Sequence, residues 1–478
     1  MPRWKKILVA FAIALAAGVI LFVIFVGPWP GYTAGFEGKD YFARNIAAIE
    51  EGAKLIKLTP SPGRLRAGWH CVLMNPQPGV PMAGYGARHD IRNYFFGGRP
   101  KRLSTGVHDN LHVKALALSD GDDTLLIVSA DMLLVPPNIA EMVCAEIARH
   151  TPLRERNIFF GASHTHEGPG AWGKGLAAFI TAGRYDPNIV SFLASAFAQA
   201  ALKAYENMEP AEMARGFFYA EQFIKNRTRN APVDTRLNYL VLKKDDGKRC
   251  ILIRYSAHPT IVDDDFLQFT AEYPGFLQSA LEAAMPNTTV AYIGGSVGSC
   301  GPRAPAGEND IERAKAMGEE LARLFIANVA PDTLQWNPYP EIASINIPLE
   351  PPPFQLRLNR SLRFSPLLAR LLGASQKAWM QSARVENVIL IGIPGDFSGE
   401  ISLEWSQWAS AKGYELWPCS FAPGYVGYIS PDKYYNAPNA TREYETGLMS
   451  WTGPHQEAFF TTLMKLMFEK LTSAPTGG

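Results

Sequence analysis

Residues 157–170 read Asn-Ile-Phe-Phe-Gly-Ala-Ser-His-Thr-His-Glu-Gly-Pro-Gly, and this stretch decides how the rest of the chain is interpreted. Its apolar half, residues 158–162, predicts a short buried strand that ends in small residues. His164 and His166 would then present their imidazoles on one face of the extended chain, because side chains alternate along a strand. The glycines and the proline that follow force a turn and allow a ligand to approach the backbone. The stretch therefore indicates a metal site at a strand end, against the plainer alternative of two histidines that only form hydrogen bonds there.

The segments around this strand predict an α/β fold. The near-continuous apolar run 124–130 has the pattern of a strand covered on both faces. A helical segment, 137–150, separates it from the strand in 157–162, and the order strand, helix, strand favours a parallel pair. Further helices are expected at 186–206 and 311–329. We therefore predict mixed central β-sheets flanked by helices in a single catalytic domain.

Three more apolar runs end in polar or small residues that could complete the same site. Loops that follow strand ends are where binding sites assemble in open α/β sheets. His258 is the most informative of these residues, because it follows a strand and precedes a proline, which repeats the geometry expected at His164. The runs and the residues that follow them are 250–256 with His258, 289–293 with Ser299 and Cys300, and 388–393 with Asp396.

Composition and charge restrict the possible functions. The chain has 478 residues, with 46 lysines and arginines against 45 aspartates and glutamates, so its net charge is +1. No dense basic stripe interrupts this balance, which argues against a nucleic-acid partner. The 5 cysteines are widely spaced without a Cys-x-x-Cys pair, so buried free thiols are expected and a cysteine-based zinc site is not. Nothing in the sequence specifies an oligomeric state.

The N-terminus predicts a transmembrane anchor over residues 1–27. Arg3, Lys5 and Lys6 precede an uninterrupted apolar segment, residues 7–26, that would reach roughly 30 Å as a helix. Basic residues on the short flank favour a cytoplasmic N-terminus, which puts the rest of the chain in a periplasmic or extracellular compartment. A cleaved signal peptide is the alternative, but its apolar core would be shorter and would end in small residues at a cleavage site.

A linker that contains one helix is predicted between the anchor and the catalytic domain, over residues 28–64. Its helix is expected at 41–56, and Pro60 and Pro62 mark the boundary that follows. The catalytic domain is predicted to occupy residues 65–478.

A series of short motifs runs along the chain in a fixed order: Met82-Ala83-Gly84-Tyr85, Gly106-Val107-His108, Val128-Ser129-Ala130-Asp131, the segment from His164 to Pro169, Asn226-Arg227-Thr228, Ala257-His258-Pro259-Thr260, Pro394-Gly395-Asp396-Phe397, Gly427-Tyr428-Ile429-Ser430, Tyr444-Glu445 and Gly453-Pro454. Through these motifs the chain from about Arg66 to Glu469 resembles the catalytic domain of the neutral/alkaline non-lysosomal ceramidases. The resemblance implies a hydrolase that cleaves the N-acyl bond of ceramide-like sphingolipids to a fatty acid and a sphingoid base.

The resemblance also implies a cofactor and its ligands. In that family a zinc ion is bound, and the matching positions here are His164, His258, Asp396 and Tyr428. Two imidazoles, a carboxylate and a further oxygen donor suit Zn²⁺ and leave a position for water. Asp396 stands where the family usually has glutamate, so the backbone must shift or the ion must sit differently, and Glu400 is the alternative ligand.

The same resemblance assigns the groups that act on the substrate. It implies that metal-activated water attacks the amide carbonyl. His166 is expected to donate a proton to the departing nitrogen. Arg227 and Tyr444 are expected to form hydrogen bonds with the developing oxyanion.

Two further positions leave alternatives open. Gly301 occupies the place of a serine in the family's loop, which disfavours a serine-nucleophile mechanism there. Ser299 or Cys300 could act as a nucleophile, although the spacing implies no base beside them. Asp131 is expected either to orient a zinc ligand or to cap a strand end.

The sequence therefore predicts a membrane-anchored zinc amidohydrolase of the ceramidase type, with a lipid amide as its substrate. Two alternatives are kept: a zinc hydrolase of the same fold that acts on another amide or ester lipid, and a catalytically inactive lipid-binding module. The near-complete set of ligands and oxyanion donors weighs against the inactive module.

Overall fold

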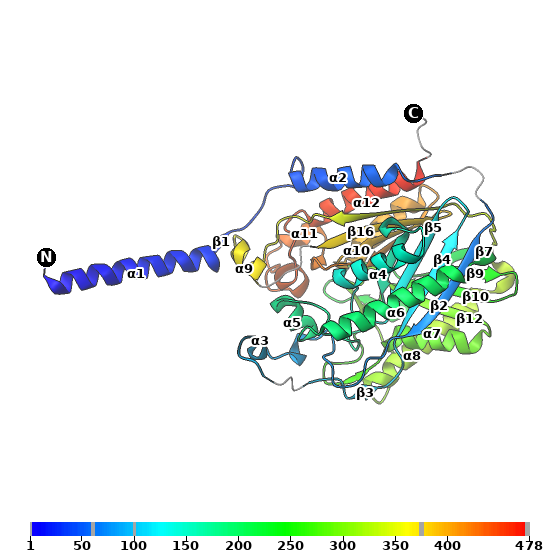
Figure 1. The fold of residues 1–478 in the computed structure, drawn as a ribbon, viewed down its shortest axis with the longest axis horizontal. Coiled ribbons are helices and arrows are strands. Elements are labelled where there is room, and N and C mark those ends of the chain that lie inside the picture. The colour runs from blue at the N-terminus through cyan, green and yellow to red at the C-terminus, as the bar shows by residue number, and fades with distance from the viewer. Residues whose placement is uncertain (1, 59–62, 99–101, 372–376, 474–478) are drawn as a thin grey trace.

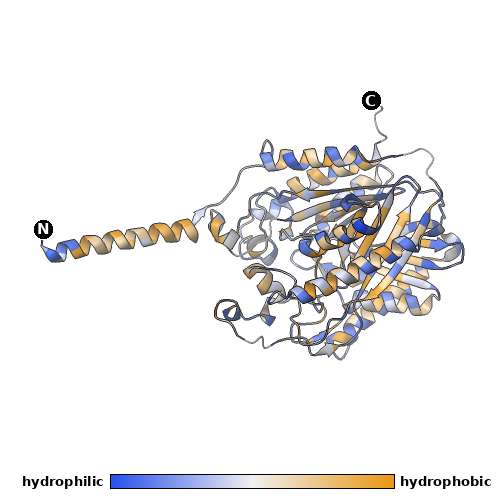
Figure 2. Ribbon diagram, in the orientation of Figure 1, coloured by the Kyte–Doolittle hydropathy of each residue, from blue (hydrophilic) through white to orange (hydrophobic). Residues whose placement is uncertain are grey.

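A single long helix projects from a body of mixed β-sheets and helices in the computed structural model of the chain (Figure 1). The structure describes the chain except for residues 1, 59–62, 99–101, 372–376 and 474–478. The body contains the predicted α/β architecture, and apolar residues are concentrated on its strands (Figure 2).

The largest element of the body is an eight-stranded mixed sheet with the order β12-β10-β9-β7-β2-β4-β5-β6. Strands β10 and β12 are parallel, as are β5 and β6, and the other neighbouring pairs are antiparallel. Its strands are β2 Arg66–Leu73, β4 His112–Ser119, β5 Thr124–Ala130, β6 Ile158–Ala162, β7 Glu209–Tyr219, β9 Arg236–Lys244, β10 Arg249–Tyr255 and β12 Thr288–Gly294.

This sheet is curved, so that its two ends lie beside each other. The hydroxyl of Ser129 in β5 donates a hydrogen bond to the carbonyl of Tyr292 in β12. The side chain of Ile293 packs against Gly161 of β6, where an added Cβ would lie only 2.4 Å from it. A larger residue at this position would force the Ile293 side chain to move, so glycine favours the close approach of the two strands. The curvature brings the loops after β6 and β10 together, although these strands are far apart in the strand order.

A four-stranded sheet, with the order β14-β16-β17-β19, packs against the first. A shared apolar core joins the two sheets, and it includes Phe159 and Ile293 from the first sheet with Leu390 and Trp417 from the second. The strands of the second sheet are β14 Ile342–Leu349, β16 Ala378–Val385, β17 Val388–Ile393 and β19 Glu415–Ser420.

Helices cover the outer faces of both sheets (Figure 1). Side-chain caps begin two of them, because Asp186 accepts a hydrogen bond from the amide of Asn188 and Asn309 accepts one from the amide of Glu312. The longer helices are α2 Asp40–Ala53, α4 Pro137–His150, α6 Pro187–Glu206, α7 Glu272–Ala284, α8 Asp310–Asn328, α10 Gly399–Ser410 and α12 Gln456–Thr472, and the shorter ones are α3 Arg92–Phe96, α5 Leu176–Ala182, α9 Pro366–Leu371 and α11 Asp432–Tyr435.

Short two-stranded ladders fix the loops between these elements. They pair β8 with β13 and β18 with β20, which carry residues of the candidate site, and they also pair β1 with β15 and β3 with β11. The bounds are β1 Trp29–Pro30, β3 Gly106–Val107, β8 Ile224–Asn226, β11 Gln268–Phe269, β13 Cys300–Pro302, β15 Leu362–Arg363, β18 Asp396–Phe397 and β20 Tyr428–Ile429.

A buried ionic network ties the two sheets together. The guanidinium of Arg254 in β10 pairs with Asp234 at 2.9 Å, and both side chains are fully buried. The same guanidinium donates to the hydroxyl of Ser402 in α10 at 3.2 Å and to the carbonyl of Pro418 in β19 at 2.8 Å. A buried charge needs such complete pairing, because an unpaired one would be costly to desolvate.

The predicted strands and helices around the motifs are confirmed to within one or two residues. The parallel pair of strands at 124–130 and 158–162, with the helix between them, is present as β5, α4 and β6. The linker helix ends at Ala53, earlier than expected, and its buried Ile49 packs into the core beside the four-stranded sheet. The expected boundary at Pro60 and Pro62 falls outside the described residues.

Helix α1, Arg3–Phe25, contains no buried residue and has a mean hydropathy of 3.1 in its most apolar window. Its surface is apolar along most of its length (Figure 2). It is a candidate membrane span or signal sequence by length and composition, since both kinds of segment share these properties.

Candidate metal and catalytic site

His164 follows β6 in a conformation that side chains rarely adopt, with φ at 70°. Its backbone amide donates to the carbonyl of Met132 at 3.0 Å, and its side chain is buried. Backbone strain of this kind costs on the order of 1–3 kcal/mol and is found where a site imposes the geometry. The turn therefore aims the two imidazoles at one point. This corrects the strand-alternation argument, because the strand ends at Ala162, before either histidine.

The Nε2 atoms of three imidazoles converge in the interior. The separations are 3.0 Å between His164 and His258, 3.2 Å between His166 and His258, and 3.3 Å between His164 and His166. These three residues form a group that could hold a metal ion. Ligand nitrogens at 2.0–2.1 Å from a tetrahedral Zn²⁺ lie about 3.3 Å apart, so the observed triangle has the size of one face of such a coordination shell.

The far sides of the imidazoles differ in how they are held. Nδ1 of His164 donates to the carbonyl of Leu133 at 2.6 Å, and Nδ1 of His258 donates to that of Val297 at 3.3 Å. Such bonds fix the tautomer that leaves Nε2 free to bind a metal. Nδ1 of His166 is buried and has no hydrogen-bond partner among the described residues. Among the three histidines, only the Nδ1 of His166 therefore lacks a hydrogen bond to the described part of the chain.

Asp396 lies beside this triangle, at the end of the four-stranded sheet. Its Oδ1 is 3.8 Å from Nε2 of His164 and 3.9 Å from Nδ1 of His258. Oδ2 accepts a hydrogen bond of 2.5 Å from the hydroxyl of Tyr425, whereas Oδ1 is buried without a partner within the described part of the chain. A buried carboxylate oxygen is costly unless it is paired or bound to a metal. The side chains present therefore fit a divalent cation at this point.

Burial controls the protonation of these groups. It lowers the pKa of His164 to about 3 and the pKa values of His166 and His258 well below their usual range, with the charge of Arg227 acting in the same direction. It raises the pKa of Asp396 to about 7, against the hydrogen bond from Tyr425 and the charge of Arg227. Neutral imidazoles are the form that binds metal ions.

The remaining predicted site residues surround the same point. Tyr428 pairs with Asp396 in the parallel ladder of β18 and β20. Its hydroxyl accepts a hydrogen bond of 2.7 Å from Nη2 of Arg227, and its ring lies 5.4 Å from the ring of Tyr444. Nε of Arg227 donates to the carboxylate of Glu445 at 3.1 Å, which fixes the guanidinium. The structure therefore brings every predicted site residue into one cluster.

This cluster opens into a polar hollow of about 600 Å³. Its walls include His166, His258, Arg227, Tyr428 and Tyr444, so a substrate in the hollow would meet the proposed donors and ligands together.

Two residues that support the site were missed by sequence reasoning. One is Tyr425, the partner of Asp396. The other is Arg88, which donates to the carbonyl of His166 at 2.5 Å and to the buried carboxylate of Glu167 at 3.0 Å. Gly84, in the first of the sequence motifs, also packs against this histidine, because its φ is 115° and an added Cβ would lie 2.7 Å from the side chain of His166.

The alternative residues are engaged elsewhere. Glu400 accepts hydrogen bonds from Asn226 at 3.1 Å and from Tyr434 at 3.0 Å. Ser299 shares a hydrogen bond of 3.1 Å with Ser398 and accepts one from the amide of Gly399. Cys300 is buried, which raises the pKa of its thiol and makes it a poor nucleophile.

Asp131 supports the strand end. Its carboxylate accepts hydrogen bonds from the amide of His112 at 3.0 Å and from the side chain of Gln278 at 3.5 Å. Asp131 was expected either to orient a zinc ligand or to cap a strand end. The imidazoles of His164 and His258 instead form their hydrogen bonds with the backbone carbonyls of Leu133 and Val297.

Comparisons with known proteins point to the same family as the sequence motifs do. Residues 90–286 match the family described as neutral/alkaline non-lysosomal ceramidase, N-terminal. The neutral ceramidase of Mycobacterium tuberculosis (strain ATCC 25618 / H37Rv) is 26% identical over 148 residues, which cover 29% of this chain and 23% of that relative. The match therefore spans less than a quarter of the length of that curated relative.

Solved structures extend the likeness to most of the chain. A crystal structure of neutral ceramidase from Pseudomonas aeruginosa has a TM-score of 0.71 at 15% identity, covering 86% of this chain and 75% of that one. A structure described as ceramidase complexed with C2 has a TM-score of 0.71 at 14% identity, with coverages of 87% and 76%. At this level of identity the likeness concerns the fold.

Proposed function

We propose that the chain is a member of the neutral/alkaline non-lysosomal ceramidase family that its residues 90–286 match, and that it hydrolyses the N-acyl bond of ceramide-like sphingolipids and releases a fatty acid and a sphingoid base. The observation that carries this proposal is the convergence of three imidazoles and a buried carboxylate oxygen, unpartnered among the described residues, beside a polar hollow that His166 and His258 line. We propose residues 65–478 as the catalytic domain, residues 1–27 as an anchor and residues 28–64 as the linker between them.

We propose Zn²⁺ as the cofactor, held by His164, His258, Asp396 and Tyr428. The donor set of imidazole, carboxylate and phenolic oxygen atoms suits this ion. When bound, zinc would polarise the amide carbonyl and lower the pKa of water, which supplies the nucleophile at neutral pH.

The protein's own groups would manage the protons and the charge. Hydrolysis breaks the carbon–nitrogen bond, adds hydroxyl to the acyl carbon and gives the second hydrogen of water to the amine. His166 is neutral at pH 7, so it can accept a proton from the attacking water and pass it to the departing nitrogen. Arg227 and Tyr444 would form hydrogen bonds with the developing oxyanion, and the carboxylate of Glu445 holds Arg227 in position.

We propose that α1 anchors the protein in a membrane, with its N-terminus in the cytoplasm and the catalytic domain outside it. Arg3, Lys5 and Lys6 on the short flank favour this orientation. The helix end is attached to the body, because Ser365 donates from its amide to the carbonyl of Val26 at 2.9 Å and from its hydroxyl to that of Ile24 at 2.6 Å. Such an attachment would hold the domain close to a lipid surface.

The test is release of labelled fatty acid from acyl-labelled ceramide by the full chain in lipid nanodiscs. Release should stop when a chelator removes the metal and should return when zinc is added. A variant such as His258→Ala should remain inactive after zinc is added. If zinc-loaded protein releases fatty acid from another amide or ester and not from ceramide, the substrate assignment is wrong. If it hydrolyses neither, the proposed activity fails.

A further inference from the structure

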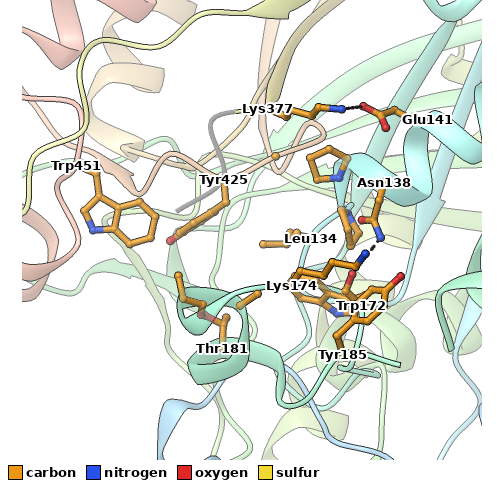
Figure 3. Close-up of a pocket in the computed structure, with 16 residues that line it drawn as sticks. Leu134, Asn138, Glu141, Trp172, Lys174, Thr181, Tyr185, Lys377, Tyr425 and Trp451 are labelled. Carbon is orange, nitrogen blue, oxygen red and sulfur yellow. Dashed lines mark hydrogen bonds and ion pairs between the residues drawn. The ribbon is translucent and has the colours of Figure 1, made fainter. Parts of the chain in front are cut away.

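A second cavity, of about 410 Å³, is lined in part by Tyr425, the partner of Asp396 (Figure 3). Its walls are made by α5, by the segment that carries Leu134 and by the aromatic side chains of Trp172, Tyr425 and Trp451. We propose that this apolar pocket binds a long hydrocarbon chain of the lipid substrate. The proposal rests on the function proposed above and adds a place for one part of the substrate.

The walls of the pocket present mainly carbon surfaces. The indole nitrogen of Trp172 donates outward to the carbonyl of Pro169 at 3.0 Å, and that of Trp451 donates to Leu448 at 3.0 Å. The hydroxyl of Tyr425 donates to Asp396. The polar atoms of all three aromatic side chains are thus satisfied elsewhere, so they offer carbon surfaces to an occupant. Such walls suit an apolar ligand, and the volume lies in the range of ligand pockets.

Charged groups are found at the periphery. Lys377 pairs with Glu141 at 2.9 Å, and the ammonium of Lys174 lies 4.9 Å from the ring of Tyr185 (Figure 3). An apolar interior with a charged periphery suits a chain whose polar end lies outside the pocket.

The pocket lies next to two of the proposed metal ligands. Tyr425 forms part of the pocket wall and also holds the carboxylate of Asp396. Leu134 lines the pocket, and the preceding residue, Leu133, holds the imidazole of His164 through its carbonyl. A chain in the pocket would therefore pack directly behind two ligand positions. The polar hollow, which contains His166 and Arg227, has a separate set of walls.

The pocket lies where a hydrocarbon chain could enter it from a membrane. Helix α5, which forms one wall through Ala177, Ala178 and Thr181, lies on the side of the body from which α1 projects (Figure 1). If α1 spans a membrane, this wall lies toward the lipid surface. A hydrocarbon chain could then enter with little exposure to water, which is favourable because its transfer from water drives burial.

The test uses binding and not hydrolysis. The full chain in nanodiscs is titrated with a medium-chain fatty acid that carries bromine at its terminal carbon, and in a second arm with the corresponding brominated alkyl amine. Bromine quenches nearby indoles, so Trp172 and Trp451 report occupation of the pocket. The two arms distinguish an acyl chain from the chain of a sphingoid base. Trp172→Phe should reduce the quenching amplitude without abolishing saturation.

A pair of variants on α5 provides the control. Ala178 lines the pocket, whereas Ile180 on the same helix is exposed. Ala178→Phe should fill the cavity and weaken binding at least about tenfold, because each buried methylene contributes about a fourfold change in affinity. Ile180→Phe should leave binding within about twofold of wild type. Ala177→Phe replaces the first variant if Ala178→Phe does not fold.

The results separate this proposal from the proposed function. Saturable quenching by either probe that is lost in Ala178→Phe and kept in Ile180→Phe supports the pocket, even if the protein hydrolyses no ceramide. Absence of saturable quenching in wild type overturns the pocket, even if ceramide is hydrolysed. Equal quenching in wild type and in a folded pocket-filling variant also overturns it.

Discussion

The hydroxyl of Tyr425 donates a hydrogen bond of 2.5 Å to Oδ2 of Asp396, and this bond leaves Oδ1 directed toward the imidazoles of His164 and His258. The family resemblance leads us to expect a glutamate at this position, and the side chain of Asp396 is shorter by one methylene. A carboxylate that is short by one methylene needs a fixed orientation to serve as a ligand, and Tyr425 supplies it from outside the cluster.

Tyr425→Phe should therefore weaken metal binding. Loss of a bond that orients a ligand typically costs about 10–100-fold in affinity, and we expect this change in zinc competition titrations. Tyr435→Phe is the control, because it removes a buried hydroxyl that contacts Gln355, away from the cluster. Unchanged zinc affinity in Tyr425→Phe would show that Asp396 is not oriented through this bond.

The variant His166→Ala tests whether His166 binds the metal or transfers a proton. We assign His166 to proton transfer, because its Nδ1 lacks the protein partner that His164 and His258 have. The variant should keep its zinc and lose about 10²–10⁴-fold in kcat, the usual contribution of a general acid or base. Loss of zinc together with activity would instead make His166 a ligand, as its Nε2 separations also allow.

Arg227→Lys tests the stabilisation of the oxyanion. Lysine keeps the charge but loses the fork that joins Glu445, Tyr428 and the carbonyl of Gly298. We expect kcat to fall about 10²–10³-fold with little change in zinc content. Arg229→Lys, in the same loop and paired mainly with Glu443, should have a much smaller effect. Equal losses in the two variants would contradict a specific role for Arg227.

The pH dependence of stability should reveal the pair of Asp234 and Arg254. Burial raises the pKa of the Asp234 carboxyl, but the guanidinium groups of Arg254 and Arg236 together outweigh burial and hold that pKa below its usual range. Its contribution to stability is therefore present above the unfolded pKa of about 3.9 and is lost as the pH falls toward the folded pKa. Asp234→Asn should lower the free energy of unfolding by about 3–5 kcal/mol at pH 7, since it leaves Arg254 without its counter-charge.

Urea unfolding of wild type and Asp234→Asn at several pH values measures this difference. The gap between the two proteins should narrow as the pH falls below about 4. A gap that stays constant or widens on acidification would contradict the assignment.

Local pattern was sufficient to predict the elements that carry the site. The continuous apolar runs at 124–130 and 388–393 became β5 and β17, because strands buried on both faces leave a signal that depends on no distant residue. His164, His258 and Asp396 follow such strands, so their placement at strand ends was predictable. Their convergence was expected from family resemblance and depends in the structure on the curved sheet.

The residues that escaped prediction act through contacts made only in the folded chain. Tyr425 lies in the loop after β19, whereas Asp396 begins β18, which follows β17. Their hydrogen bond forms only in the folded chain, and no spacing in the sequence relates the two residues. The same holds for Arg88 and its bonds to His166 and Glu167. The left-handed turn at His164 was also missed, because a residue other than glycine rarely takes that conformation.

Metal content of the purified full chain, measured by elemental analysis after dialysis, tests the central claim most directly. We expect one zinc ion per chain in wild type and a near-complete loss in His164→Ala and in Asp396→Asn, with Tyr435→Phe retaining the wild-type amount. Zinc content that is absent from wild type, or equal in all four proteins, would contradict a metal centre built on these side chains.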